Sequence, residues 1–464
     1  MNTVDLVVKG GAVWTPAGTV KTDIAIRKGR IAALGNAGFF PRAAQVIDAT
    51  HKFILPGLID THTHHRDPGF THKEDITTAT QAAAAGGVTL SVGMPNVQPP
   101  TVTVARYHKI IELSKKKAVV HFNHNPAPTK ISEIPKLAKT GCLAFKLFMI
   151  RDSRRSYPHM PGIGVHHQGE LLRIFEAVAE TGLPLMVHPH NQEIMDTIEQ
   201  RYWKRGQRGP AAYADAYHDY KGIVWDTAIA SLLRLQEATG ARLHILHINT
   251  QGGIDLVRRA KDKGRAVTCE VNPWALFLGN ARENLKKLGP YCLGIWLPEE
   301  DSLALWDAIR DGTIDVVGTD HAPHTRQEKE VGWKDMWKAP GGAPVIQEYL
   351  SLFLTEVNRG RLSLDQVVRV TSHNPARVFG LHPKKGTIQV EADADLTIVD
   401  LAKEETIRTE NVYSKCGWTP YDNQKVLGVP IATVIKGKVV MWEGKVIGKP
   451  GDGEWATPVK NKKP

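Results

Sequence analysis

The sequence predicts an α/β fold, in which a (β/α)8 TIM barrel carries a small β-sandwich domain formed by the N- and C-terminal segments. Between about Leu55 and Leu381, short apolar strands alternate with amphipathic helical patterns, as they do in parallel βα units. At both ends of the chain, short strands instead follow one another at hairpin spacing. We therefore assign residues 1–54 and 385–448 to the sandwich, 55–384 to the barrel and 449–464 to an extended tail.

The strands of the small domain are expected at the two ends of the sequence. Apolar and polar residues alternate from Asp5 to Val13, and such alternation is typical of a half-buried strand. Glycine-rich turns separate further segments of this kind: Ile24–Ile26, Arg30–Leu34, Leu396–Val399, Val434–Ile435, Val439–Trp442 and Val446–Ile447.

The barrel segment begins with the apolar stretch Lys52–Leu58. Further candidate strands are Thr89–Val92, Val119–Phe122, Ala144–Phe148, Leu185–Val187, Leu243–His247, Ala266–Glu270 and Val316–Thr319. The helical patterns, several of which end at a glycine as helix caps do, are Ile76–Ala85, Gly169–Thr181, Trp225–Thr239, Ile254–Lys263, Leu303–Asp311 and Pro344–Val357. Tyr202–Gly222 interrupts the alternation, and we expect an inserted loop there.

Composition and charge limit the possible partners. Apolar runs are too short to span a membrane, and Met1–Lys9 lacks the pattern of a secretion signal. The four cysteines are scattered through the chain, which is typical of free thiols in a reducing cytoplasm. The formal net charge is +11 without a concentrated basic helix, which favours an anionic small-molecule substrate over nucleic acid.

Two histidines mark the end of the first barrel strand. His62 and His64 lie two residues apart, so their side chains point to the same face of a strand. Two imidazoles that converge in this way supply half of a divalent transition-metal site. On their own they are equally well explained as ordinary surface or core histidines.

The other barrel strands carry metal-binding residue types at or near their ends. Lys146 lies in an apolar strand, and His188, His247 and Asp320 each end one. Any single one of them is better explained as a core polar residue, but five strand ends with metal-competent groups indicate a metal centre, because active sites of (β/α)8 barrels form at the carboxyl ends of the strands.

The composition of this cluster suggests two metal ions. Four histidines and one aspartate can hold two divalent cations about 3.5–4 Å apart, but an anion has to bridge them. Lys146 is the candidate on the intervening strands, although an ammonium group cannot bind a cation. Reaction with CO₂ would convert it to a carboxylate, N6-carboxylysine, that can form the bridge.

With these residues in place, the chain resembles the cyclic amidohydrolases, the group that contains dihydroorotase, hydantoinase and allantoinase. The resemblance extends from Asp5 to about Gly448, and its motifs are closest to dihydroorotase. These motifs are Thr-Asp-His-Ala-Pro-His at 319–324, Thr-Ser-His-Asn-Pro-Ala-Arg at 371–377, Arg-Asp-Pro-Gly-Phe-Thr-His-Lys-Glu-Asp at 66–75 and Met-Pro-Asn-Val-Gln-Pro-Pro at 94–100.

The resemblance implies a role for each residue of the cluster. His62 and His64 would bind the first metal, His188 and His247 the second, and carboxylated Lys146 would bridge them. Asp320 would bind the first metal and act as general base. Zinc is the expected metal, and manganese, cobalt or nickel would also suit these ligands. The family is commonly dimeric or tetrameric.

Three further residues bear on the substrate. In dihydroorotase-like sites the residues matching Arg66, Asn96 and His324 hold the substrate carboxylate, and their donors suit an anionic oxygen pair. Arg66 could instead pair with Asp67 or Glu74. The resemblance therefore implies hydrolysis of dihydroorotate or another carboxylated cyclic amide. The alternatives are hydantoinase or allantoinase activity, a non-catalytic scaffold relative, and a single-metal deaminase.

The sequence departs from the family where the substrate ring would lie. Pro189 and His190 replace the usual Ala-Glu pair after His188, and Gly294–Asp301 stands where dihydroorotases have a Pro-Pro-Leu-Arg loop. The loop after Lys146 is unusually basic, with Arg151, Arg154 and Arg155, and Tyr157 is a candidate to stabilise the oxyanion. These departures leave the metal ligands intact and the identity of the ring open.

Overall fold

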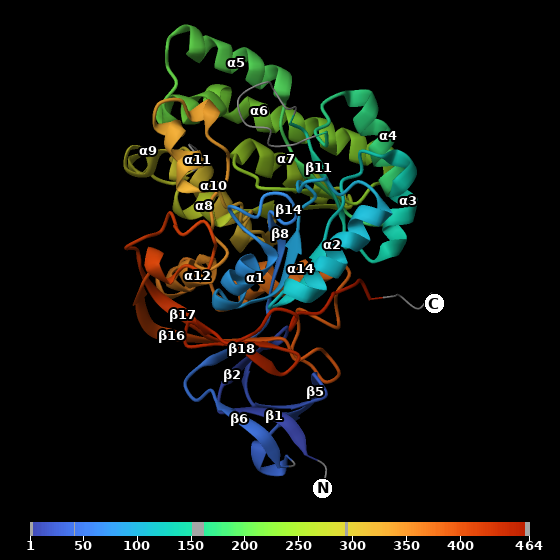
Figure 1. The fold of residues 1–464 in the computed structure, drawn as a ribbon, viewed down its shortest axis with the longest axis vertical. Helices are drawn as coiled ribbons and strands as arrows, with labels where there is room; N and C mark the ends of the chain where they lie inside the picture. Colours follow the sequence, from blue (N-terminus) through green and yellow to red (C-terminus); the bar gives the residue numbers. More distant parts are fainter. Residues whose placement is uncertain (1–2, 41, 151–161, 293–295, 460–464) are drawn as a thin grey trace.

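The computed structural model describes residues 3–40, 42–150, 162–292 and 296–459. Figure 1 shows the strands from the two ends of the chain gathered at one end of the long axis. The parallel strands and most helices lie at the other end. The molecule has a mixed α/β fold, as the alternation of strands and helices predicts.

Within the described residues, eight parallel strands form two sheets in the middle of the chain. The first has the order β10-β9-β8 and the second the order β11-β12-β13-β14-β15. Their bounds are β8 Leu58–Thr63, β9 Val88–Gly93, β10 His121–His124, β11 Phe145–Phe148, β12 Leu185–His188, β13 Leu243–Ile245, β14 Val267–Val271 and β15 Val316–Val317. Each overlaps a predicted strand or directly follows one.

The two parallel sheets meet at two seams, where the described residues form no continuous ladder. At the first seam, between β10 and β11, the Lys146 amide donates to the carbonyl of Pro126 over 3.0 Å. At the second, between β15 and β8, the His64 amide donates to the carbonyl of His321 over 2.8 Å. Isolated hydrogen bonds therefore link the sheets beside the predicted site, among them also those from Ala144 to Asn125 and from Thr319 to Asp60.

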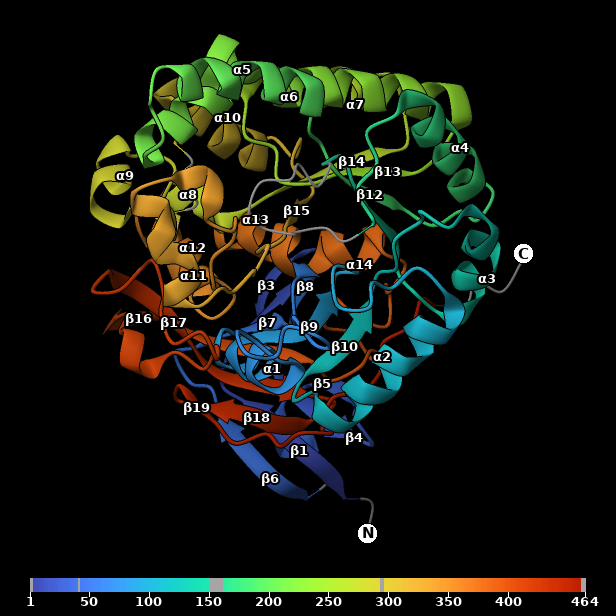
Figure 2. The ribbon, with the colours of Figure 1, turned by 45° about the horizontal axis from the view of Figure 1, so that its top comes forward.

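Helices cover the outer side of these strands. Figure 2 shows α4, α6 and α7 outside strands β12 to β14. The longer helices are α1 Ile76–Ala85, α2 Val104–Lys117, α4 Gln168–Ala179, α5 Gln192–Lys204, α6 Pro210–Thr239, α7 Gln251–Asp262, α10 Glu299–Arg310 and α12 Tyr349–Asn358. The Asp75 carboxylate caps α1 by accepting from the amides of Thr77 and Thr78.

The expectation of an inserted loop at Tyr202–Gly222 was wrong. Helix α5 continues to Lys204 and α6 begins at Pro210, with non-helical backbone only at 219–222 within α6. Trp203 and Tyr213 pack edge to face against Trp337, with ring centroids 5.9 and 5.1 Å apart. Burial of these aromatic rings accounts for an ordered helical segment where the local sequence suggested a loop.

The two ends of the chain share one sheet. It has the order β19-β18-β17-β16-β7-β2-β3, in which β16 pairs antiparallel with β7. A second sheet has the order β5-β4-β1-β6. Their bounds are β1 Val4–Lys9, β2 Ala12–Thr15, β3 Gly18–Lys21, β4 Asp23–Arg27, β5 Arg30–Gly35, β6 Ala43–Asp48, β7 Phe53–Pro56, β16 Leu396–Thr406, β17 Lys425–Ile435, β18 Lys438–Trp442 and β19 Lys445–Val446.

One buried apolar cluster joins these two sheets. Leu6 and Ile24 come from the four-stranded sheet, and Val13, Ile54 and Val434 come from the seven-stranded sheet. Because each sheet buries one face against the other, the N- and C-terminal segments depend on each other for their core.

The C-terminal segment runs along the free edge of β10. The Phe122 amide donates to the carbonyl of Glu454 over 3.1 Å, and the Ala456 amide donates to the carbonyl of Phe122 over 3.0 Å. Ala456 is buried with residues of several parallel strands, among them Leu90 and Met186. The tail therefore fills part of the seam between β10 and β11.

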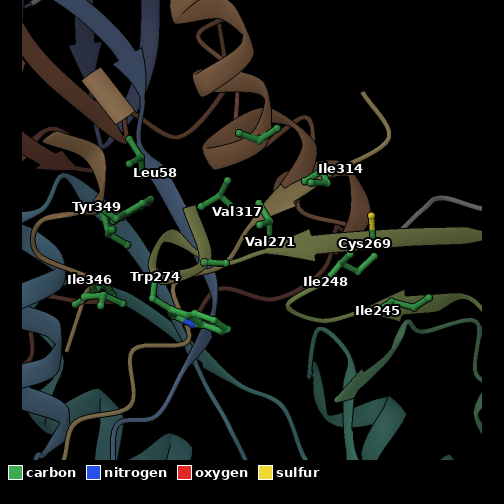
Figure 3. Packing of buried hydrophobic residues seen from close by; sticks show 14 of the residues in the cluster. Leu58, Ile245, Ile248, Cys269, Val271, Trp274, Ile314, Val317, Ile346 and Tyr349 are labelled. Carbon is green, nitrogen blue, oxygen red and sulfur yellow. The ribbon is translucent and has the colours of Figure 1, made fainter. Parts of the chain in front are cut away.

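The parallel strands are anchored by a large apolar core. Figure 3 shows Val271 and Val317 beside Ile314, with Trp274, Ile346 and Tyr349 nearby. Fully burying an aliphatic or aromatic side chain contributes about 1.5–3 kcal/mol, so this core is a rigid base for side chains at the strand ends.

Candidate functional site

A histidine and carboxylate cluster lies at the ends of β8 and β15. Nε2 of His64 is 2.9 Å and Nε2 of His62 is 3.3 Å from Oδ1 of Asp320. One ligand atom from each of these residues lies within 4.8 Å of the others, and within the described ranges they are the one group of three or more that could hold a metal in this way. The structure therefore brings together the three residues predicted for the first metal.

Lys146 on β11 faces the same cluster. Its side chain is fully buried, and its Nζ lies 3.2 Å from Nε2 of His62 and 4.6 Å from the centre of the Phe148 ring. Burial lowers the pKa of Lys146 to about 8, because the charged ammonium is poorly solvated there. The amine is thus partly neutral near physiological pH, which is the form that reacts with CO₂.

His188 and His247 lie next to each other, and His247 lies next to His62. Their ring centroids are 4.4 Å apart, and the His247 ring is 5.9 Å from that of His62. Burial lowers the pKa of His247 to about 3 and that of His188 well below its usual value. Neutral imidazoles are the form that binds a metal, so both residues are in the form suited to hold one.

The two histidines of β8 are oriented by hydrogen bonds on their other nitrogen. Nδ1 of His62 lies 2.7 Å from Oε1 of Glu270, and Nδ1 of His64 lies 2.7 Å from Oδ1 of Asn96. Both Nε2 atoms therefore point toward Asp320. Such outer partners are typical of metal-binding histidines, and the donor set of four imidazoles, one carboxylate and Lys146 fits two divalent ions.

Two of the three predicted carboxylate-binding residues are in contact with each other. Nη2 of Arg66 lies 2.9 Å from Nε2 of His324, and its Nε donates to the carbonyl of Pro323 over 3.3 Å. Asn96 is placed differently, because its Oδ1 faces His64. Its Nδ2 is buried, and the described residues give that atom no hydrogen-bond partner.

Two lysines that the sequence analysis missed surround His324. Nζ of Lys73 lies 3.3 Å from Nδ1 of His324 and 3.0 Å from Oε1 of Glu328. Lys329 donates to the carbonyls of Pro340 and Gly342. Burial lowers the pKa of Lys73 to about 8 and that of Lys329 to about 7. Arg66, Lys73 and His324 therefore bring several buried hydrogen-bond donors close together, beside the carboxylate of Glu328.

The segments that depart from the family lie near this site only in part. The His190 ring is buried, with its centroid 6.2 Å from that of His188. Asp301 instead accepts a hydrogen bond from the amide of Gln251 over 2.7 Å, at the start of α7. Arg151, Arg154, Arg155 and Tyr157, which were of interest as a basic loop and a possible oxyanion donor, lie outside the described residues.

Glu270 was also missed, although the sequence held a signal for it. It is a carboxylate within the apolar strand β14, and its side chain is fully buried. A buried acid in a strand calls for a partner, but only the three-dimensional structure identifies that partner as His62.

No helix within the described ranges has the length and apolarity needed to cross a membrane.

Comparison with known proteins identifies the family and the individual proteins to which this chain is similar. Residues 53–440 match the model of the amidohydrolase family. The chain is 32% identical over 461 residues to an L-hydantoinase from Paenarthrobacter aurescens, covering 98% of each protein. It is 32% identical over 409 residues to a dihydroorotase from Methanosphaera stadtmanae, covering 86% of this chain and 88% of that one. The solved L-hydantoinase from Arthrobacter aurescens superposes with a TM-score of 0.92 at 32% identity, over 98% of this chain and 100% of that chain.

Proposed function

The chain belongs to the amidohydrolase family, and from this premise we propose that it hydrolyses the C–N bond of a cyclic amide with two divalent metal ions. The observation that carries the proposal is the cluster of His62, His64 and Asp320 at the strand ends, with Lys146 3.2 Å from His62. The same premise supports a finer description of the fold, in which the two parallel sheets form one (β/α)8 barrel and the end strands form a β-sandwich.

The metal ligands divide into two sets around Lys146. His62, His64 and Asp320 would hold one ion, His188 and His247 the other, and N6-carboxylated Lys146 would lie between them. When bound, two such ions lower the pKa of a water molecule and polarise a substrate carbonyl. Imidazole and carboxylate ligands suit zinc, and also manganese, cobalt or nickel.

Asp320 carries the proton chemistry in this proposal. Its carboxylate is held next to His62 and His64, and the neighbouring histidines keep its pKa well below the usual value, against the effect of burial. It is therefore ionised and can take a proton from the attacking water. It then returns that proton to the ring nitrogen that leaves when the C–N bond breaks.

The proposed substrate is a ring that bears a carboxylate, such as dihydroorotate. Arg66, Lys73 and His324 provide closely spaced donors within the protein interior, and Nδ2 of Asn96 is a further buried donor. A desolvated carboxylate needs such partners. Relatives named dihydroorotase are consistent with this substrate class.

A second candidate is a ring without a carboxylate, as in a hydantoin. An L-hydantoinase is similar to this chain over 98% of its length, and Arg66 already has partners in the protein. In that case Arg66 supports the loop that follows β8. A non-catalytic scaffold is disfavoured because all six predicted ligand residues are present.

A panel of substrates tests the proposal. Protein of known metal content is assayed for turnover of dihydroorotate, carboxymethylhydantoin, hydantoin, allantoin and dihydrouracil. We expect hydrolysis of a carboxylated ring and loss of that activity on chelation. Turnover of hydantoin alone would favour the second candidate, and failure to hydrolyse any cyclic amide with two metals bound would contradict the proposal.

A further inference from the structure

We infer that Glu270 is a positioning residue, whose carboxylate orients His62 for metal binding. The inference rests on the proposed function, because its consequence is measured as metal affinity. Glu270 is not one of the metal ligands. It lies on strand β14 and acts on the metal site through its hydrogen bond with His62.

The hydrogen bond between these residues determines the tautomer of His62. Oε1 of Glu270 lies 2.7 Å from Nδ1 of His62, and both side chains are buried. A carboxylate only accepts hydrogen bonds, so Nδ1 carries the proton, and in the neutral imidazole that binds a metal Nε2 then keeps its lone pair. That Nε2 atom lies between Nζ of Lys146 at 3.2 Å and Oδ1 of Asp320 at 3.3 Å.

Neighbouring residues leave little free space around the Glu270 carboxylate. A Cβ atom on Gly318 would lie 2.1 Å from Oε2 of Glu270, so only glycine fits there without a shift. Nδ2 of Asn272 approaches Oε1 at 3.5 Å, and Nε2 of His244 lies 4.0 Å from Oε2. The bond to His62 is therefore the short contact of this carboxylate within the described residues.

The two histidines of β8 differ in the charge of their partners. His62 faces the carboxylate of Glu270, whereas His64 faces the neutral amide of Asn96. A charged acceptor makes a stronger hydrogen bond than a neutral one, and such outer partners strengthen the bond of a histidine to a metal. His62 should therefore be the stronger of these two metal ligands, because its partner is the charged carboxylate of Glu270.

The substitution Glu270→Gln tests this inference, since it keeps the volume and an acceptor oxygen but removes the charge. The affinity for Zn²⁺ is measured by competition with a chelator, and the thermal unfolding of the metal-free proteins is measured in parallel. We expect Zn²⁺ to bind about 10- to 100-fold more weakly.

The matched control is Asp395→Asn, which affects another buried carboxylate that contacts a histidine, His121, and also pairs with Lys385. Oδ1 of Asp395 lies 3.1 Å from Nε2 of His121, at the opposite end of the parallel strands from the site. This variant should lower the unfolding temperature but leave the affinity for Zn²⁺ unchanged. Unchanged affinity in Glu270→Gln, or equal losses in both variants, would overturn the inference.

A measurement on the unmodified protein covers the case in which Glu270→Gln does not fold. Histidine labelled with ¹⁵N reports which ring nitrogen carries the proton, and the His62 signal is assigned by its loss in His62→Gln. We expect a proton on Nδ1 in the metal-free protein, and a proton on Nε2 would overturn the inference. Failure of the unmodified protein to bind any metal would instead refute the proposed function.

Discussion

At the scale of single residues, Asp320 combines an unusual backbone with a central position. Its φ of 50° lies in the left-handed region, and so does the φ of 35° at His247. Such conformations cost about 1–3 kcal/mol in a non-glycine residue and concentrate at functional sites. Here they aim both side chains at the same cluster.

Replacing Asp320 by asparagine separates its two proposed roles. The variant keeps the size and one oxygen ligand but cannot accept a proton, so kcat should fall by about 10²–10⁴. Metal content should fall much less. The check is steady-state kinetics together with elemental analysis of the same sample, and an almost unchanged kcat would assign proton transfer to another group.

Arg66 tests the substrate class. Removing one partner of a desolvated charge pair costs about 2–5 kcal/mol, so Arg66→Ala should lower kcat/KM for a carboxylated ring by roughly 30- to 4,000-fold. Arg66→Lys should recover little, because an ammonium cannot make the planar two-point contact. Dihydrouracil, if turned over, serves as the control, since equal losses on both substrates would make Arg66 structural.

The sequence indicated the proposed ligand residues because they lie within or just after strands whose carboxyl ends converge in this fold. His62, His64 and Asp320 meet as that rule predicts. The same rule could not show that Glu270 orients His62, or that Asn96 faces His64. Those contacts join residues from different strands, and local sequence does not encode distances between them.

At the scale of elements, helix α1 and the segment 202–222 show what local signals can predict. The predicted bounds of α1 match the structure because Asp75 caps one end and Gly86 follows the other. The segment 202–222 lacks an equally clear pattern, and its helices depend on aromatic packing with Trp337 from a distant part of the chain. Packing in the folded protein, rather than the local sequence pattern, therefore determines the structure of this segment.

The contact between the C-terminal tail and β10 leads to a stability prediction. A Cβ atom on Gly453 would lie 1.9 Å from the carbonyl oxygen of Val120. Gly453→Ala should therefore displace the tail and destabilise the protein by about 1–3 kcal/mol. Chemical denaturation measures the difference in the free energy of unfolding.

The matched control for the tail is Gly169→Ala in helix α4. No atom lies within 4 Å of a Cβ there, and the backbone is helical. That variant should be stabilised by about 0.5–1 kcal/mol, because alanine favours a helix over glycine. Equal stability of the two variants would mean that the tail contributes nothing to the seam beside β10.

At the scale of the whole molecule, buried titratable groups predict acid sensitivity of the metal-free protein. Burial strongly lowers the pKa of seven of the described histidines, His64, His65, His124, His188, His218, His247 and His324, and lowers that of His373 and His382 to a smaller extent. Burial also strongly raises the pKa of three carboxyls, to about 7 in Asp60, about 8 in Glu348 and about 6 in Asp301, and raises that of Asp226 to a smaller extent.

These two sets of groups change the free energy of unfolding with pH in opposite directions. Below pH 6.5 the unfolded chain protonates its histidines while the folded one does not, so stability is lost as pH falls. At these pH values the three carboxyls are protonated only in the folded state. They offset three of the seven protons that the histidines take up on unfolding, so the unfolded chain binds about four more protons than the folded one. From these groups alone, the free energy of unfolding should fall by on the order of 5 kcal/mol per pH unit between pH 6 and 4.5.

Urea denaturation of chelated protein at several pH values measures this slope. His218→Gln removes one of the seven histidines without touching the metal cluster, and it should lower the slope by about one proton. A free energy of unfolding that stays constant from pH 6.5 to 4.5 would mean that these histidines are not held neutral in the folded protein.

Metal stoichiometry in the unmodified protein and in Lys146→Ala tests the central claim most directly. We predict two metal ions per chain in the unmodified protein, loss of cyclic amide hydrolysis on chelation, and recovery when Zn²⁺ and bicarbonate are added back. Lys146→Ala should hold one ion or none and lose nearly all activity, with partial rescue by short carboxylic acids. Two bound ions and near-normal turnover in Lys146→Ala, or full turnover after chelation, would contradict a metal pair bridged by Lys146.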